Sequence, residues 1–228
     1  MGYLKEAGIE VLALDIDGTL YSRSQLNTRM VRSLFPDIRL SCAFNWARKE
    51  IRRIQDTELL DDAARLGFLQ RQAELVAHRL KRDPSDVKKA IDRQFYSAWE
   101  KSFQTIKPFS SMREALEDVH RQGVRIILFS DFPIADKPAT LKIDDLIEAA
   151  YTSEESGYLK PSAQAFEYLL AKAGVPAEKM LYIGDSYDKD CTGAAQAGLG
   201  SWYLGKKKNA GVFADRVAPS WKHLKDML

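Results

Sequence analysis

One short stretch constrains the fold of this chain more than any other. An apolar run, Val11–Leu14, leads directly into Asp15-Ile16-Asp17-Gly18. The run predicts a buried strand, and residues two apart in an extended strand point to the same face. Two ionised carboxylates so close repel each other unless a cation, a shared proton or water lies between them. The stretch suits a metal site that binds phosphate, although a solvated turn can have the same sequence.

The composition is that of an ordinary globular protein. The chain has 228 residues, of which 45% are hydrophobic and 29% charged, so it can form one large domain or a domain with an insert. Cys42 and Cys191 lie far apart, which argues against a disulfide framework or a zinc site. No apolar run approaches the roughly 20 residues of a membrane span, and the first ten residues lack a signal-peptide segment. We therefore expect a cytoplasmic protein.

The chain divides into a helical middle and a flanking part with strands. Within residues 21–107, Phe44, Ala47, Ile51 and Ile54 follow at steps of 3, 4 and 3, as on one helix face. From residue 108, short apolar runs alternate with helical patterns. The expected strands are 125–129, 150–152, 180–183 and 201–204, and the expected helices include 135–149, 163–173, 190–197 and 220–228. This alternation predicts an α/β fold with a parallel sheet.

Several polar side chains follow the expected strands at their carboxyl ends, namely Asp15, Asp17, Ser130 and Asp185. In open parallel sheets the functional crevice lies outside these ends. Segments far apart in the chain therefore bring acids and a hydroxyl to one sheet edge, which favours a site over a solvated turn.

With these positions in view, the chain resembles the haloacid dehalogenase-like (HAD) hydrolase superfamily. Four matches occur in the order of that family: Asp15-x-Asp17-Gly-Thr, Ser130 after a strand, Lys160 before a helix, and Gly184-Asp185-x-x-x-x-Asp190. The resemblance implies a Rossmann-like core formed by residues 1–20 and 108–228. Residues 21–107 would take the place of an inserted helical cap domain of the C1 type.

The resemblance also implies a role for each matched residue. Asp15 would attack phosphorus and form an aspartyl-phosphate, and the Asp17 carboxyl would act as general acid and then as general base. Mg²⁺ suits a site of oxygen ligands. Asp15, the Asp17 backbone carbonyl and Asp185 would hold it, with Asp190 as a further ligand or as a residue behind the ligands. The phosphate would be bound by Ser130, the backbone N–H of Asp131, and Lys160.

Four positions leave alternatives open. Ser130 could serve only as a helix cap, and Lys160 could be a solvated lysine before Pro161. Asp131 stands where the family more often has Asn, and a carboxylate beside a phosphate is unfavourable unless it turns away. Asp188 competes with Asp190 for the second acidic position of the last motif. We prefer Asp190, because a run of small residues follows it as in the family.

The middle segment is basic. Residues 21–107 carry 18 Lys and Arg against 11 Asp and Glu, either as solvated helix faces or as a basic cover that attracts anions. Arg48, Lys49 and Arg52 are candidate specificity residues there. Trp46, Trp99 and Phe103 either pack in its core or line a substrate pocket. No basic stripe with interleaved aromatic residues indicates nucleic-acid binding.

The sequence thus predicts a Mg²⁺-dependent phosphomonoester hydrolase acting on a small phosphorylated metabolite, without a nucleic-acid or membrane partner. A true dehalogenase of the family lacks the second aspartate of the first motif, so Asp17 argues against that activity. The alternatives are a phosphomutase or phosphotransferase of the same superfamily, and a non-catalytic interaction protein with the same fold. Nothing in the sequence indicates the oligomeric state.

Overall fold

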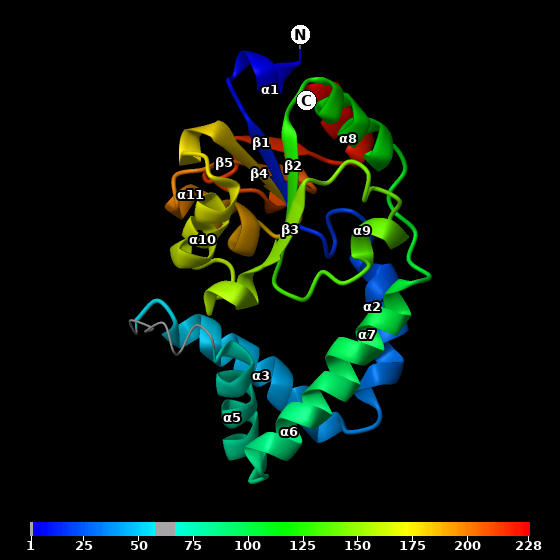
Figure 1. Cartoon of the computed structure of the whole chain (residues 1–228), viewed down its shortest axis with the longest axis vertical. Helices are drawn as coiled ribbons and strands as arrows, with labels where there is room; N and C mark the ends of the chain where they lie inside the picture. Colours follow the sequence, from blue (N-terminus) through cyan, green and yellow to red (C-terminus); the bar gives the residue numbers. More distant parts are fainter. Residues whose placement is uncertain (1, 58–66) are drawn as a thin grey trace.

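A computed structural model describes residues 2–57 and 67–228 of the chain. Met1 and residues 58–66, the latter inside the predicted helical insert, lie outside the described residues. Within the described part, six strands form one parallel sheet in the order β3-β2-β1-β4-β5-β6; Figure 1 labels β1 to β5. The strands are β1 (Val11–Leu14), β2 (Arg125–Ser130), β3 (Ala149–Thr152), β4 (Met180–Gly184), β5 (Gly200–Leu204) and β6 (Arg216–Ala218). The predicted α/β fold is confirmed.

The first strand occupies the middle of the sheet because both of its edges are paired. Leu14 lies opposite Leu128 of β2 and Ile183 of β4. All four residues of β1 are buried, as expected for a strand of a parallel sheet that is covered on both faces. The carboxyl ends of β1, β2 and β4 therefore meet at one edge, where Asp15, Asp131 and Asp185 follow.

Helices cover both faces of the sheet (Figure 1). Leu12 and Leu14 pack in the same apolar cluster as residues of α8 (Met112–Arg121) and α12 (Trp221–Met227). Val11 and Ala13 point to the other face, in the cluster that contains residues of α10 (Ala163–Ala173). The remaining helices of this part include α1 (Tyr3–Glu6), α9 (Lys137–Thr140) and α11 (Thr192–Gln196), the last preceded by a π-helical turn at Tyr187–Cys191.

A helical part lies between β1 and β2 in the chain and sits beyond the carboxyl edge of the sheet (Figure 1). Its helices are α2 (Arg23–Leu34), α3 (Ile38–Ile54), α5 (Phe68–Leu80), α6 (Pro84–Ile91) and α7 (Ser97–Phe103), with a π-helical turn at Asp92–Tyr96 before α7. It has its own apolar cluster, which includes Phe44 and Ala47 of the expected helix face. No helix of the described residues is long and apolar enough to cross a membrane.

Side chains of α3 connect this helical part to the sheet. Arg48 donates to Oε1 of Glu154 at 2.5 Å and to the backbone oxygen of Asp131 at 2.6 Å. The Gln55 amide donates to the backbone oxygen of Leu159 and accepts from its backbone N–H, both at 2.8 Å. Because Arg48 and Glu154 are 4% and 7% exposed, their charges must be satisfied by each other rather than by water.

The predicted helix at 135–149 is wrong. Only Lys137–Thr140 is helical, and turns follow. Lys142 has a φ of 57°, a left-handed conformation that ends a right-handed helix. Leu141 and Ile143 are both fully buried two residues apart, which fits an irregular loop packed on the core better than a helix with one buried face. The edge strand β6 was also absent from the predicted elements.

Replacing Arg48 by Ala tests how much the contact between Arg48 of α3 and Glu154 contributes to stability. Glu154 would be left as a buried carboxylate without its cation, so we expect the free energy of unfolding to fall by about 3 kcal/mol, measured by urea denaturation. Arg113→Ala removes an exposed arginine that pairs with Asp145 and serves as the control, with an unfolding midpoint close to that of the wild type. If both substitutions lower the free energy of unfolding equally, burial of the Arg48–Glu154 pair does not make it more important than an exposed pair.

Candidate active site

The Lys160 side chain lies among the aspartates at the carboxyl ends of the strands, which we call the acidic edge. Its ammonium donates to Oδ1 of Asp15 at 2.7 Å, to Oδ1 of Asp190 at 2.7 Å and to the Tyr182 hydroxyl at 2.9 Å. Lys160 is 2% exposed. Burial by itself lowers the pKa of a lysine, but the carboxylates of Asp15 and Asp190 raise the pKa of Lys160 well above its ordinary value. Lys160 is therefore a fixed, charged group within the core.

Asp15 is held in one orientation by partners on both oxygens. Lys160 donates to Oδ1, and the Thr19 hydroxyl donates to Oδ2 at 3.1 Å. Burial raises the pKa of Asp15 to about 7; Lys160 opposes this shift, and Asp190 and Asp185 add to it. The Asp15 carboxylate is thus oriented, and an added positive charge beside it would favour its ionised form.

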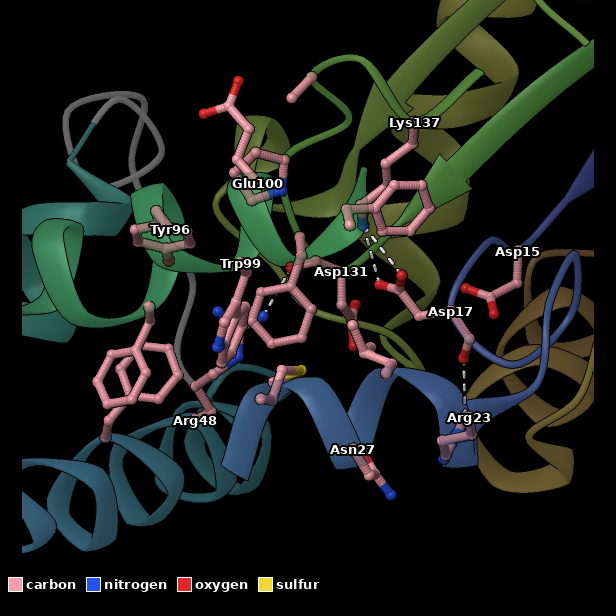
Figure 2. A pocket seen from close by; sticks show the side chains of 18 of the residues that line it. Asp15, Asp17, Arg23, Asn27, Arg48, Tyr96, Trp99, Glu100, Asp131 and Lys137 are labelled. Atoms are coloured by element: carbon pink, nitrogen blue, oxygen red, sulfur yellow. Dashed lines mark hydrogen bonds and ion pairs between the residues drawn. The ribbon is translucent and has the colours of Figure 1, made fainter. Parts of the chain in front are cut away.

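Asp17 points to a different set of donors. Lys137 donates to its Oδ1 at 2.9 Å, the Ser130 hydroxyl donates to Oδ2 at 3.2 Å, and the Tyr21 hydroxyl donates to Oδ1 as well. Burial would raise the pKa of Asp17, but Lys137 and these hydroxyls outweigh it and hold the pKa below its usual value. Figure 2 shows Lys137, the first residue of α9, pointing at Asp17.

The Asp131 carboxylate turns away from Asp15 and Asp17. Its Oδ1 accepts from the Ser153 hydroxyl at 2.8 Å and from the backbone N–H of Lys160 at 3.0 Å, and its Oδ2 accepts from Arg52 at 2.7 Å. Burial would raise the pKa of Asp131, but Arg52 and Lys160 lower it. The carboxylate at this position is neutralised by the cation that α3 supplies.

Three carboxylates lie close enough to share a cation. Asp15, Asp185 and Asp190 each offer an oxygen, and these oxygens lie within 4.8 Å of one another. A Cβ added to Gly18 would stand 2.3 Å from Oδ2 of Asp185, so the backbone after Asp17 runs directly against this group. Burial raises the pKa of Asp185 to about 6, with Arg23 opposing. Three closely spaced carboxylates, all offering oxygen, fit a hard divalent cation.

Asp190 rather than Asp188 belongs to this group. Its Oδ1 contacts Lys160, and its Oδ2 accepts from the backbone N–H of Ser186 at 2.9 Å. Asp190 is buried and Asp188 is exposed.

Arg23, at the start of α2, reaches the same edge from the helical part. Its guanidinium donates to Oδ1 of Asp185 at 2.9 Å and to the backbone oxygen of Asp17 at 3.2 Å. Both acceptors are atoms that the sequence predicted as metal ligands. A cation at the acidic edge and the Arg23 guanidinium would therefore share two acceptors.

A cavity of about 830 Å³ opens beside these groups, between the sheet edge and the helical part. Asp15, Asp17 and Lys160 line it from the sheet side. The candidate specificity residues Arg48, Lys49 and Arg52 line it from α3, as do Trp99 and Phe103 from α7. Figure 2 shows α2 and α7 on two sides of this space. Trp46 is not among its lining residues; its ring lies under the guanidinium of Arg79, at 4.5 Å.

The structure thus brings the predicted residues to one edge, with two differences of detail. Ser130 is fully buried and donates to Asp17, and the side chain of Asp131 serves the contact with α3. The sequence reasoning missed Lys137, Arg23 and Tyr21 as partners of the acids. Tyr21 and Arg23 follow the first motif closely and could have been considered, whereas nothing in the sequence marks Lys137, which begins α9.

Comparison with known proteins gives a consistent result. Residues 9–198 match the family described as haloacid dehalogenase-like hydrolase. A glyceraldehyde 3-phosphate phosphatase of Methanopyrus kandleri is 26% identical over 196 residues, which cover 84% of this chain and 82% of that protein. Pyrimidine 5'-nucleotidase YjjG of Escherichia coli is 32% identical over 78 residues, 34% of each chain.

Other matches are shorter or show the fold alone. A glyceraldehyde 3-phosphate phosphatase of Methanothermobacter thermautotrophicus is 28% identical over 100 residues, which cover 42% of this chain and less than half, 44%, of that relative. The solved structure of a 2-haloacid dehalogenase from Pseudomonas syringae has a TM-score of 0.64 at 18% identity and covers 96% of this chain and 97% of its own.

Arg23→Ala tests whether the acidic edge binds a cation. Removing a competing positive charge should tighten Mg²⁺ binding about threefold, the size expected of a partly exposed ion pair, in isothermal titration calorimetry. Arg53→Ala, which removes an exposed arginine paired with Glu50, should leave the affinity unchanged. Weaker Mg²⁺ binding by the Arg23 variant would show that the two cations do not share these acceptors.

Proposed function

The chain belongs to the haloacid dehalogenase-like hydrolase family, and from this premise we propose that it is a Mg²⁺-dependent phosphatase of small phosphorylated metabolites. The observation that carries the proposal is the contact of the buried Lys160 ammonium with Asp15 and Asp190 at one edge of a large cavity. The relatives named above as phosphatases support the reaction class.

Asp15 is the proposed nucleophile. One of its carboxylate oxygens forms a bond to phosphorus while the bond from phosphorus to the leaving alcohol breaks, which leaves the phosphoryl group on Asp15. Lys160 and Thr19 orient the carboxylate for this step. Lys160 also offsets the charge that the incoming phosphate brings.

Asp17 is the proposed general acid and base. Its carboxyl protonates the leaving oxygen, and the resulting carboxylate then removes a proton from the water that attacks the phosphoryl group and releases inorganic phosphate. The donors around Asp17 favour its ionised form, which is the form needed for the second step. A bound phosphate dianion nearby raises the pKa of Asp17 and favours the protonated form needed for the first.

The carboxylate group fits Mg²⁺, which prefers oxygen ligands and retains several waters. Asp15, the backbone carbonyl of Asp17, and Asp185 would hold it, with Asp190 completing the acidic group. When bound, Mg²⁺ reduces the repulsion between the Asp15 carboxylate and the phosphate. The backbone N–H of Asp131, together with Ser130 and Lys160, is proposed to bind the phosphate oxygens.

Residues 21–107 are proposed to act as a cap domain over the core formed by residues 1–20 and 108–228. The contacts of Arg48 and Arg52 with Glu154 and Asp131 support this division. A cap that covers the cavity limits access of bulk water and supplies the surface that contacts the substrate's organic part.

Substitution of the two aspartates of the first motif separates their proposed roles. With Mg²⁺ and a generic aryl phosphate, Asp15→Asn should lower kcat by at least about a thousandfold, since it removes the nucleophile. Asp17→Asn should also be slow, but acid-quenched samples should retain a phosphoryl group on Asp15, detected by mass spectrometry. Asp188→Asn, at an exposed aspartate outside the acidic group, is the matched control and should keep wild-type activity.

Two results would overturn the proposal. Undiminished turnover by Asp15→Asn would exclude the aspartyl-phosphate route. Preferential transfer of the phosphoryl group to a sugar hydroxyl instead of water would indicate a phosphotransferase or mutase.

A further inference from the structure

One side of the cavity is apolar, and it belongs to the helical part and the loop after β2. This apolar wall consists of Leu26, Met30, Trp99, Phe103 and Phe132. The rings of Trp99 and Phe132 meet edge to face, with centroids 4.9 Å apart and planes at 81°. The wall therefore joins α2, α7 and the start of the loop after β2 into one surface.

The positions of the two aspartates of the first motif indicate which part of a substrate meets this wall. Asp15 is held by Lys160 and Thr19 on the sheet side, whereas the partner of Asp17 is Lys137. The Lys137 ammonium lies 5.4 Å from the centre of the Phe103 ring. Since Asp17 is proposed to protonate the leaving oxygen, the alcohol attached to that oxygen lies on the side of Lys137, Phe103 and the rest of the apolar wall. Figure 2 shows Lys137 and Trp99 bordering the same space.

The chemistry of the wall discriminates between possible alcohols. Hydroxyl groups of a short sugar placed against the ring faces of Trp99, Phe103 and Phe132 would lose water without gaining hydrogen bonds from those faces, which is unfavourable. A flat ring gains apolar burial and edge-to-face or stacked contacts at the same place. Asn27 and Gln104 also line the cavity and can offer hydrogen bonds to polar atoms of such a ring.

The size of the cavity agrees with this chemistry. Pockets for drug-sized ligands measure about 300–1,000 Å³, and this one measures about 830 Å³. A triose phosphate would leave most of that volume, and the wall itself, in contact with water.

We propose that the substrate is a phosphomonoester whose alcohol carries an aromatic ring, and that this ring packs against the apolar wall while the phosphate faces Asp15. The inference rests on the proposed phosphatase function and adds the class of leaving group. A nucleoside and a simple aryl-substituted alcohol both offer this chemistry.

The test compares esters with leaving alcohols of similar reactivity, so that differences report on binding. Wild-type protein with Mg²⁺ should hydrolyse phenethyl phosphate with a kcat/KM about tenfold or more above that of n-propyl phosphate, mainly through KM, the effect expected for burying a phenyl ring. A pyrimidine nucleoside monophosphate in parallel identifies which source of the ring is preferred. Equal kcat/KM values for phenethyl and n-propyl phosphate, or a preference for glyceraldehyde 3-phosphate, would overturn the inference.

Variants test whether the preference for phenethyl phosphate depends on the apolar wall. Trp99→Ala should reduce the ratio of kcat/KM for phenethyl phosphate to kcat/KM for n-propyl phosphate about fivefold, as expected for loss of an aromatic contact. Trp46→Ala removes a tryptophan of the same helical part that does not line the cavity and should keep the wild-type preference. If Trp99→Ala does not fold, Leu26→Asn, which makes the wall polar without removing a ring, should reduce the preference in the same direction. An unchanged preference in the folded wall variant would contradict the assignment.

Binding measurements separate this inference from the proposed function. Isothermal titration of Asp15→Asn protein with phenethyl and n-propyl phosphate measures affinity without turnover. If the variant binds phenethyl phosphate more tightly but the wild type hydrolyses neither ester, the result would contradict the phosphatase function and support binding of the ring by the apolar wall. If the wild type hydrolyses both esters and the variant binds them with equal affinity, the result would contradict ring binding by the apolar wall and support the phosphatase function.

Discussion

The contact of one buried lysine with two buried carboxylates determines how the rest of the site is arranged. Lys160, Asp15 and Asp190 come from three segments of the chain, and each is 6% exposed or less. None of them would be stable there as a lone charge. The ammonium donates to both acids and to the Tyr182 hydroxyl, so β4 and the residues that follow β1 and β4 define its position together. The geometry of the proposed active site is thus a property of the packed strand ends rather than of a flexible loop.

The helical part is connected to this edge by charge as well as by packing. Arg48 and Arg52 of α3 contact Glu154 and Asp131, so part of the basic excess of residues 21–107 neutralises two acids that follow strands of the sheet. The carboxylate of Asp131, unfavourable beside a phosphate, becomes the acceptor for this contact. The position where the resemblance leads one to expect Asn therefore links the helical part to the backbone N–H of Lys160.

The elements predicted correctly depend on residues close in the sequence, whereas the element predicted wrongly depends on contacts with distant residues. The buried strand at Val11–Leu14 and the helix at 163–173 were predicted because their patterns repeat over a few residues, as β1 and α10 show. The predicted helix at 135–149 failed because its apolar residues are buried by neighbours far away in the sequence, which permits a left-handed residue at Lys142. That irregular segment begins beside α9, whose Lys137 reaches Asp17, so the error concealed a residue of the site.

The sequence by itself determined the class of fold and the acids at the strand ends, because strand periodicity, strand-end motifs and their order are local properties. Only the tertiary structure decided which cations meet those acids, which way Asp131 turns, and which side chains form the apolar wall. Arg23 and Asp185 are 162 positions apart, and Lys137 and Asp17 are 120 apart. Contacts at such separations depend on how whole elements pack, and no pattern along the chain encodes that packing.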